Sequence, residues 1–263
     1  MINAMQIAII KKDLQGLIFN KRLFPPLLIV PFVFTIVIPT IFIFIIHFAP
    51  EEAVELQELL DLLPLSERSD NIQRLLTGLV FNHILPVFFM IIPIMAATIM
   101  AASSFAGEKE KRTLETLLYC PLTLKQIFQS KVLASFILSM LVSFGSFLIM
   151  ILVIETETLL ITGSLMPLNM NWLIIMALVS PAISLMAITL IVRGSAKAQT
   201  MEESQQRAIF LIFPVLLLVI GQFTGVLLIN AWLLLALGAV FALIAGLLMK
   251  GCIRKLNYEI LLK

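Results

Sequence analysis

Apolar residues in this chain gather into long runs. A helix needs about 20 such residues to cross the hydrocarbon core of a bilayer, where its backbone must satisfy its own hydrogen bonds. Six runs are long enough, so the pattern predicts an all-α integral membrane protein with a membrane domain of residues 23–249. The predicted spans are residues 23–48, 79–102, 132–154, 172–192, 208–229 and 231–249. Little more than Asn230 separates the last two, which predicts either a tight helical hairpin or a segment that dips into the bilayer and returns.

Residues 1–22 show a different pattern, with apolar positions that recur at helical spacing. Lys12 and Gln15 face away from the apolar side of such a helix. That side consists of Ile7, Ile10, Leu14, Leu17 and Ile18. The pattern is typical of an amphipathic helix lying on the membrane surface, and Pro25 and Pro26 would end it before the first span. The alternative is an additional cytoplasmic turn without a role.

The composition agrees with a membrane protein and argues against some partners. The chain is 60% hydrophobic and 13% charged, whereas a soluble domain carries roughly 25% charged residues. Its mean hydropathy is +1.08. The formal net charge of +2 is too small to indicate a nucleic-acid partner. The lipid bilayer is therefore the expected surrounding.

Lysine and arginine residues are concentrated in alternate connections, and this bias marks the cytoplasmic side. Sixteen of the 18 fall in residues 1–22, between the second and third spans, between the fourth and fifth, or in the tail of residues 250–263. The other two share residues 49–78 with seven acidic residues, and Glu155 and Glu157 are predicted in the connection after the third span. We therefore expect a multi-pass protein of a prokaryotic cell membrane, with both termini in the cytoplasm.

Aromatic residues and prolines refine the predicted spans. Trp172 and Trp232 fall at predicted outer ends, where tryptophan anchors helices at the membrane interface. Four prolines lie within or near the ends of spans and predict kinks. They are Pro39, Pro86, Pro93 and Pro181.

The predicted spans lack the residues that membrane enzymes and ion-coupled carriers need. Charged residues lie outside the spans or at their edges, whereas proton and ion relays use buried ionisable groups. His47 and His83 lie at predicted outer ends, where capping or interfacial roles are commoner than relays. The sequence has no paired carboxylates, metal-binding His-Glu spacing or nucleophile elbow by a span, and no G-x-x-x-x-G-K-[ST] phosphate loop. We expect no catalysis, metal or directly bound cofactor, so another chain must supply energy for any uphill transport.

Small and polar residues inside the spans allow two readings. Ser139, Ser143 and Ser146 form a stripe on the third span that would line a pathway, or their hydroxyls bond back to their own helix. Gly221 and Gly225 have the spacing of helix-packing glycines, which would serve either packing within the chain or a dimer contact.

Residues 107–131, between the second and third spans, read as helix, break and helix. The pairs Glu108 with Arg112 and Lys111 with Glu115 have the i,i+4 spacing of charge pairs. The first helix has an apolar edge and is stopped by a proline; a capping box then begins the second helix. These features are Leu114, Leu117 and Leu118, then Pro121, then Thr123 with Gln126. The alternative is a solvated loop that obeys the charge bias.

This stretch resembles permeases of type 2 ATP-binding-cassette exporters. Their pattern is matched by Glu108-Lys109-Glu110, Thr113-Leu114-Glu115, Leu117-Leu118 and Pro121, with Ile127 and Lys131 following. A second stretch, residues 193–206, is similar to the segment before the fifth span in sodium-exporter-like permeases, with Ser204 in place of the usual alanine. The arrangement of surface helix, six spans and tail agrees with the family over nearly the whole chain.

The resemblance implies a type 2 exporter transmembrane fold and a set of partners. Two permease subunits would pair, as a homodimer or heterodimer, and each would dock on a separate ATP-binding subunit that holds the ATP and Mg. Residues 107–121 would be the coupling element. The residues expected to contact the ATPase are Glu108, Glu110, Arg112, Leu114, Glu115, Leu117 and Leu118. The alternatives are a membrane sensor or immunity component on the same scaffold, and an ion-coupled secondary transporter.

Overall fold

The fold is described by a computed structural model. It describes residues 3–21, 23–49, 60, 72–111, 113, 121–163, 165–195, 198, 200–206, 209–224 and 230–254. The regular elements of these residues are helical, and six helical stretches are long and apolar enough to cross a membrane. They are Phe24–Phe48, Ile72–Glu110, Leu124–Thr162, Met170–Ser195, Met201–Phe223 and Ala231–Cys252. The predicted fold class, an all-α membrane protein with six spans, is confirmed.

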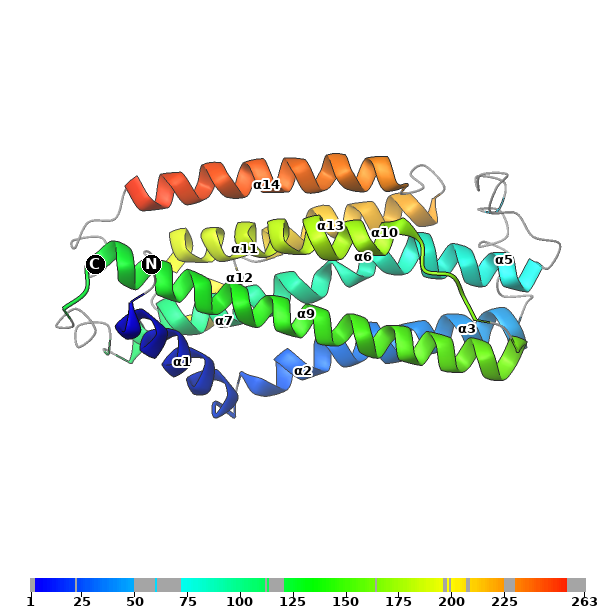
Figure 1. The fold of residues 1–263 in the computed structure, drawn as a ribbon, viewed down its shortest axis with the longest axis horizontal. Coiled ribbons are helices and arrows are strands. Elements are labelled where there is room, and N and C mark those ends of the chain that lie inside the picture. Colours follow the sequence, from blue (N-terminus) through cyan, green and yellow to red (C-terminus); the bar gives the residue numbers. More distant parts are fainter. Residues whose placement is uncertain are drawn as a thin grey trace.

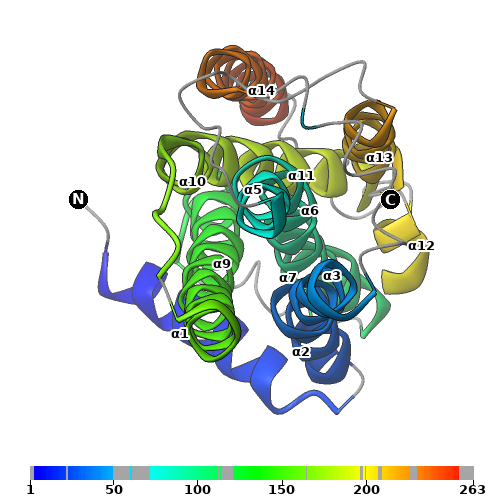
Figure 2. The ribbon, with the colours of Figure 1, turned by 90° about the vertical axis from the view of Figure 1, so that its right-hand side faces the viewer.

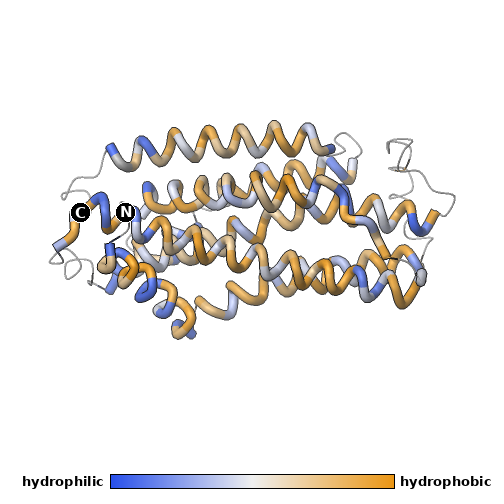
Figure 3. The backbone as a smooth tube through the Cα atoms, viewed as in Figure 1, coloured by the Kyte–Doolittle hydropathy of each residue, from blue (hydrophilic) through white to orange (hydrophobic). Residues whose placement is uncertain are grey.

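The helices form an elongated bundle around α7 (Ile91–Glu110), the last part of the second span (Figures 1 and 2). This helix packs against α9 (Leu124–Thr162) and α11 (Ser180–Ser195), and nearly all of its side chains are buried. The first span, α2 (Phe24–Phe32) and α3 (Ile38–Phe48), lies on another side of the bundle. Apolar residues follow the length of the bundle, and polar residues gather at its two ends (Figure 3).

Three of the spans contain a π-helical turn just before a proline. The turns are Val33–Val37 before Pro39, Val80–Ile84 before Pro86, and Ile175–Val179 before Pro181. A proline has no N–H, and its ring collides with the carbonyl four residues earlier. In each turn the N–H of the residue preceding proline instead reaches the carbonyl five residues back. The short helices that join these turns to the rest of the spans are α5 (Ile72–Leu79), α6 (Leu85–Phe89) and α10 (Met170–Ile174).

The third span extends well beyond its apolar run. The helix α9 has 39 residues and is about 58 Å long at 1.5 Å per residue. It begins at the predicted capping box of Thr123 and Gln126 and ends at Gly163, whose φ of 69° suits glycine. Glu155 and Glu157, predicted in the connection after the third span, belong to this helix beyond its apolar run.

The last two spans do not pack as a tight hairpin. The helix α13 (Ile209–Phe223) contacts α6 and α7, whereas α14 (Ala231–Arg254) lies against α10 and α11 (Figure 2). Gly238 permits the close approach of α14, since a Cβ there would stand 2.8 Å from the side chain of Leu178. The short polar helix α12 (Met201–Gln206) precedes α13.

The N-terminal helix α1 (Ala4–Ile18) crosses one end of the bundle, as Figure 1 shows. Its predicted apolar side is divided: Ile10 and Leu14 pack towards the bundle, whereas Ile7 and Ile18 are exposed. Apolar residues therefore lie on two sides of the helix: one side contacts α7 and α9, and another faces outwards.

The two tryptophans have different surroundings. Trp172 is fully buried, contacts the rings of Phe81, Phe89 and Phe147, and donates a hydrogen bond of 3.2 Å to the carbonyl of Phe81. The prediction that it anchors the helix at the interface is therefore wrong. Trp232 is 81% exposed, as an interfacial anchor requires.

Candidate coupling site

The last turn of α7 brings Glu108 into contact with two lysines. Its Oε1 lies 2.7 Å from Nζ of Lys12 on α1, and its Oε2 lies 2.5 Å from Nζ of Lys131 on α9. Glu108 is only 7% exposed. The beginning of residues 107–121, the segment that resembles a coupling element, is thus joined to α1 and α9 by ion pairs of one carboxylate.

Lys131 is the centre of this cluster, and it is 1% exposed. Its ammonium group also donates a hydrogen bond to the carbonyl of Ser104, lies 3.7 Å from Oδ2 of Asp13, and stands 5.5 Å above the ring of Phe105. The aliphatic stem fits beside apolar neighbours while the charge is met by oxygen atoms. Every contact of the ammonium therefore joins α9 to α7 or to α1.

Asp13 completes the charge cluster, which we define as Lys12, Asp13, Glu108 and Lys131. Its Oδ2 accepts a hydrogen bond of 2.5 Å from the hydroxyl of Ser104. Burial raises the pKa of Asp13 above its ordinary value of 3.8, because desolvation disfavours the carboxylate; the charge of Lys131 and the Ser104 hydrogen bond oppose this effect. With both carboxyl groups ionised, two cations face two anions and the cluster is neutral.

A second contact joins the two sequence stretches that resemble exporter motifs. Oε2 of Glu110 accepts a hydrogen bond of 3.0 Å from the backbone N–H of Met201, at the start of α12. The hydroxyl of Thr200 accepts from the N–H of Glu203, as its predicted capping role requires. The end of α7 and the beginning of α12 are consequently adjacent.

Arg193, at the beginning of the second stretch, fastens α11 to α14. It donates to the carbonyl of Leu248 at 3.1 Å and to the sulfur of Cys252 at 3.3 Å. A side chain at Gly251 would collide with its guanidinium group. A cation near the carboxyl end of a helix also interacts favourably with the helix dipole.

The predicted coupling residues divide into two groups. Glu108 and Glu110 belong to the contacts above. The others lie outside the described residues, so their roles stay predictions. They are Arg112, Leu114, Glu115, Leu117 and Leu118.

The residues predicted for a pathway or dimer contact are placed as follows. Ser139 and Ser146 are buried, and their hydroxyls donate to the carbonyls of Phe136 and Val142 in the same helix. Ser143 is also buried, and its hydroxyl has no hydrogen-bond partner among the described residues. Gly221 lies near the end of α13, and Gly225 is outside the described residues. A pathway role for these residues stays a prediction.

Sequence reasoning missed Lys12, Asp13 and Ser104 as members of the site and treated Lys131 only as part of a motif. One signal was available: Asp13 shares a helix side with Gln6, Ile9 and Leu17, all of which are buried. An acidic residue on the buried side of a helix requires a partner. The sequence alone does not say which basic residue supplies it.

Polar groups at the opposite end of the bundle are arranged differently. Oε1 of Glu157 accepts a hydrogen bond of 2.6 Å from the hydroxyl of Thr40, and Glu155 accepts from the N–H of Met166 at 3.2 Å. His47 donates from Nδ1 to the carbonyl of Ile43, one turn earlier in the same helix. His83 is buried at 4% exposure, so its side chain does not face outwards from the bundle, and its position at an outer end stays a prediction.

Comparison with known families gives one match. A family model described as "ABC-2 family transporter protein" matches residues 7–233. No curated protein and no solved structure matches the chain. The matched residues include most of α1 and all of α7 and α9, and with them every member of the charge cluster.

Proposed function

This chain belongs to the ABC-2 family of transporter proteins, and we propose that it is the permease subunit of an ATP-driven exporter whose ATPase is a separate chain. The observation that carries the proposal is the family match over residues 7–233. It covers the first five membrane-spanning stretches and both sequence stretches that resemble exporter motifs. The chain itself is a multi-pass membrane component, and ATP hydrolysis would take place on the partner.

Coupling would pass through residues 107–131. The last turn of α7 and the first turns of α9 form the two ends of this segment, and the charge cluster joins both to α1. A force applied to the segment would therefore reach α7, which is the most buried helix of the bundle. Because α7 contacts helices from most of the other spans, its displacement would alter the packing of several spans together.

Further features of the proposal come from the resemblance. Two permease subunits would pair, each with an ATP-binding subunit that holds ATP and Mg, and the chain would belong to the sodium-exporter-like branch. Charge bias supports cytoplasmic termini in a prokaryotic cell membrane. The basic, ATPase-facing end would then be the end where α1 crosses the bundle (Figure 1).

The docking experiment changes Leu114 and Leu117 to serine in the chain co-expressed with its ATP-binding-cassette subunit. Burying two leucines contributes roughly 2–4 kcal/mol, so their loss lowers affinity about 30- to 1000-fold. We expect the ATPase to be lost from the purified complex while the permease stays monodisperse in detergent. The matched control makes the same two changes at Leu160 and Leu165, which are exposed at the other end of the bundle.

The outcomes separate the proposal from its alternatives. Wild-type stoichiometry and normal transport in the double leucine variant would overturn the coupling role of residues 107–121. ATPase activity that no cargo stimulates in proteoliposomes would favour a sensor or immunity component. Transport without any ATPase would favour a secondary carrier.

Orientation has its own test. In a variant without Cys120 and Cys252, a cysteine at Leu160, which is 85% exposed, should react with an impermeant thiol reagent in intact cells. A cysteine at Lys111 should react only after the membrane is opened. The reverse result would place the termini outside.

A further inference from the structure

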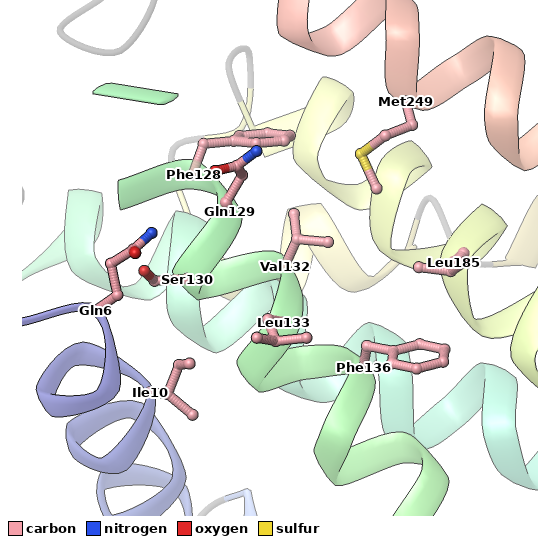
Figure 4. A pocket seen from close by; sticks show the side chains of 10 residues that line it. All are labelled: Gln6, Ile10, Phe128, Gln129, Ser130, Val132, Leu133, Phe136, Leu185 and Met249. Atoms are coloured by element: carbon pink, nitrogen blue, oxygen red, sulfur yellow. The ribbon is translucent and has the colours of Figure 1, made fainter. Parts of the chain in front are cut away.

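A groove of about 510 Å³ lies beside the charge cluster, on the outer side of α9 (Figure 4). Residues 128–136 of α9 form its floor, α1 contributes one wall, and α11 and α14 contribute the other. Its volume falls within the range of about 300–1,000 Å³ that small-molecule sites occupy. The proposed coupling mechanism makes no use of this groove.

The polar side chains of the lining lie at one end, among apolar ones, and the other end is apolar. Gln6, Gln129 and Ser130 lie towards the beginning of α9, and apolar side chains line the deeper part. Gln6 and Ser130 both donate to the carbonyl of Gln126, whereas Gln129 is exposed and makes no hydrogen bond to the described residues. The deeper side chains are Leu133, Phe136 and Leu185, whereas Phe128 and Met249 line the end near Gln129 (Figure 4). Seven residues of helix separate Gln129 from Phe136, which is about 10 Å.

The position of α1 relates this gradient to the membrane. Its outward side exposes Met5, Ile7, Ile18 and Phe19, as expected of a helix embedded at the boundary between headgroups and acyl chains. Gln6, on the same helix, marks the polar end of the groove at this level. The deeper, apolar end then lies at the depth of the hydrocarbon.

We propose that the groove binds one alkyl-chain amphiphile with an uncharged, hydrogen-bonding headgroup. The ten lining residues include no charged side chain, so they offer no fixed partner for an anionic or cationic headgroup. The free amide of Gln129 both donates and accepts hydrogen bonds and suits a hydroxyl or amide group. The alkyl chain follows α9 towards Phe136 and Leu185.

A small amphiphile fits the groove better than a second copy of this chain. A specific protein interface buries about 800 Å² on each partner. The ten residues of the lining instead surround a space of about 510 Å³, the size of a small-molecule site. Its polar groups gather at one end, as those of an amphiphile do.

The test is photolabelling of the purified full chain in lipid nanodiscs. Three probes share one diazirine-bearing C12 chain and end in a hydroxyl, a carboxylate or a trimethylammonium group. We expect the alcohol to label residues 127–137 at least fivefold more than either charged probe does, with competition by unlabelled dodecanol. The measurement is the labelled fraction of each peptide by mass spectrometry.

Two changes locate the site. Leu185→Trp fills the apolar end and should reduce labelling of residues 127–137 at least fivefold. Leu141→Trp, on an exposed part of α9 outside the groove, should leave labelling unchanged. Gln129→Leu removes the free amide, and the loss of one hydrogen bond should weaken alcohol labelling about 2- to 12-fold. If Leu185→Trp does not fold, Leu185→Phe fills the same end with a smaller ring.

Two results would overturn the proposal. The first is labelling that is independent of the headgroup and spread over all exposed helices, as lipid at any apolar surface would give. The second is disulfide formation between Gln129→Cys residues of two copies together with an unlabelled groove, which would make this face a dimer contact. Neither result depends on an ATPase, so the outcome is separable from that of the proposed transport function.

Discussion

At the two ends of α9 charged side chains are accommodated in different ways. Near its beginning, Lys131 meets the carboxylates of Glu108 and Asp13 in a buried cluster. Near its other end, Glu157 accepts a hydrogen bond from the neutral hydroxyl of Thr40. Its second carboxylate oxygen is buried and has no hydrogen-bond partner among the described residues.

This difference determines what a change of charge should do at each end. In the charge cluster each charge offsets another, so the loss of one member leaves a buried charge uncompensated. At Glu157 no opposite charge lies within ion-pair distance among the described residues, so its hydrogen bond matters more than its charge. The first end is therefore sensitive to charge and the second to hydrogen-bonding groups.

The largest expected effect is that of Lys131→Met, which keeps the aliphatic stem and removes the ammonium. Glu108 and Asp13 would then lie close together with only Lys12 to offset them. Breaking a buried ion pair from one side costs about 3–5 kcal/mol. We expect a loss of that size in the free energy of unfolding, measured in mixed detergent micelles.

Lys125→Met is the matched control, because Lys125 is exposed on the first turn of the same helix. Its effect should stay within about 0.5 kcal/mol. Equal effects of the two changes would show that the cluster does not depend on the charge of Lys131.

The spans were predictable because the bilayer requires apolar residues over a fixed length, and six runs met that requirement. The ends of the helices were not predictable in this way, because they depend on polar groups outside the apolar run. The second span was expected at residues 79–102, but its helical stretch reaches Glu110. The last residues of this stretch contact α1 and α12. Hydropathy reports solvent preference, and it carries no information about a helix that continues on polar contacts.

The candidate site was predictable only in part, for a similar reason. Local sequence placed Glu108 and Glu110 in a distinctive motif, and the Thr123 cap was evident from neighbouring residues. The pairing of Lys131 with Asp13 joins residues more than a hundred positions apart, and local spacing cannot supply it. Trp172 shows the same limit, since its burial depends on rings from α6, α9 and the π turn before Pro86.

The second prediction concerns the hydrogen bond at the other end of α9. Thr40→Val keeps the shape of the side chain and removes the donor to Glu157, which leaves both oxygens of a partly buried carboxylate without a hydrogen-bond partner among the described residues. Leaving such a group unsatisfied costs about 1–3 kcal/mol. Thr156→Val is the control in the same unfolding assay, because that hydroxyl is exposed and bonds only within its own helix. A control as damaging as Thr40→Val would argue against the pair.

The third prediction compares the two glutamates directly. Glu157→Gln keeps an oxygen that accepts from Thr40 and removes the charge, so we expect a change within about 1 kcal/mol of either sign. The same substitution at Glu108 removes the negative charge that faces two lysines. It should lower the free energy of unfolding by at least about 2 kcal/mol more. Comparable losses in thermal unfolding would break the distinction between the two ends.

The smallest expected effect is a trend with pH, which separates desolvation from pairing inside the charge cluster. The raised pKa of Asp13 means that, above pH 3.8, the folded state binds more protons at this group than the unfolded state. The contribution of Asp13 to stability is therefore fully present below pH 3.8 and is lost as the pH rises through the folded-state pKa. Asp13→Asn keeps an oxygen that accepts from Ser104 but cannot titrate. The stability of this variant relative to the wild type should thus improve as the pH rises from 4 to 7, with Lys131 still paired to Glu108. A difference that moves in the opposite direction would mean that attraction to Lys131 outweighs the burial of the carboxylate.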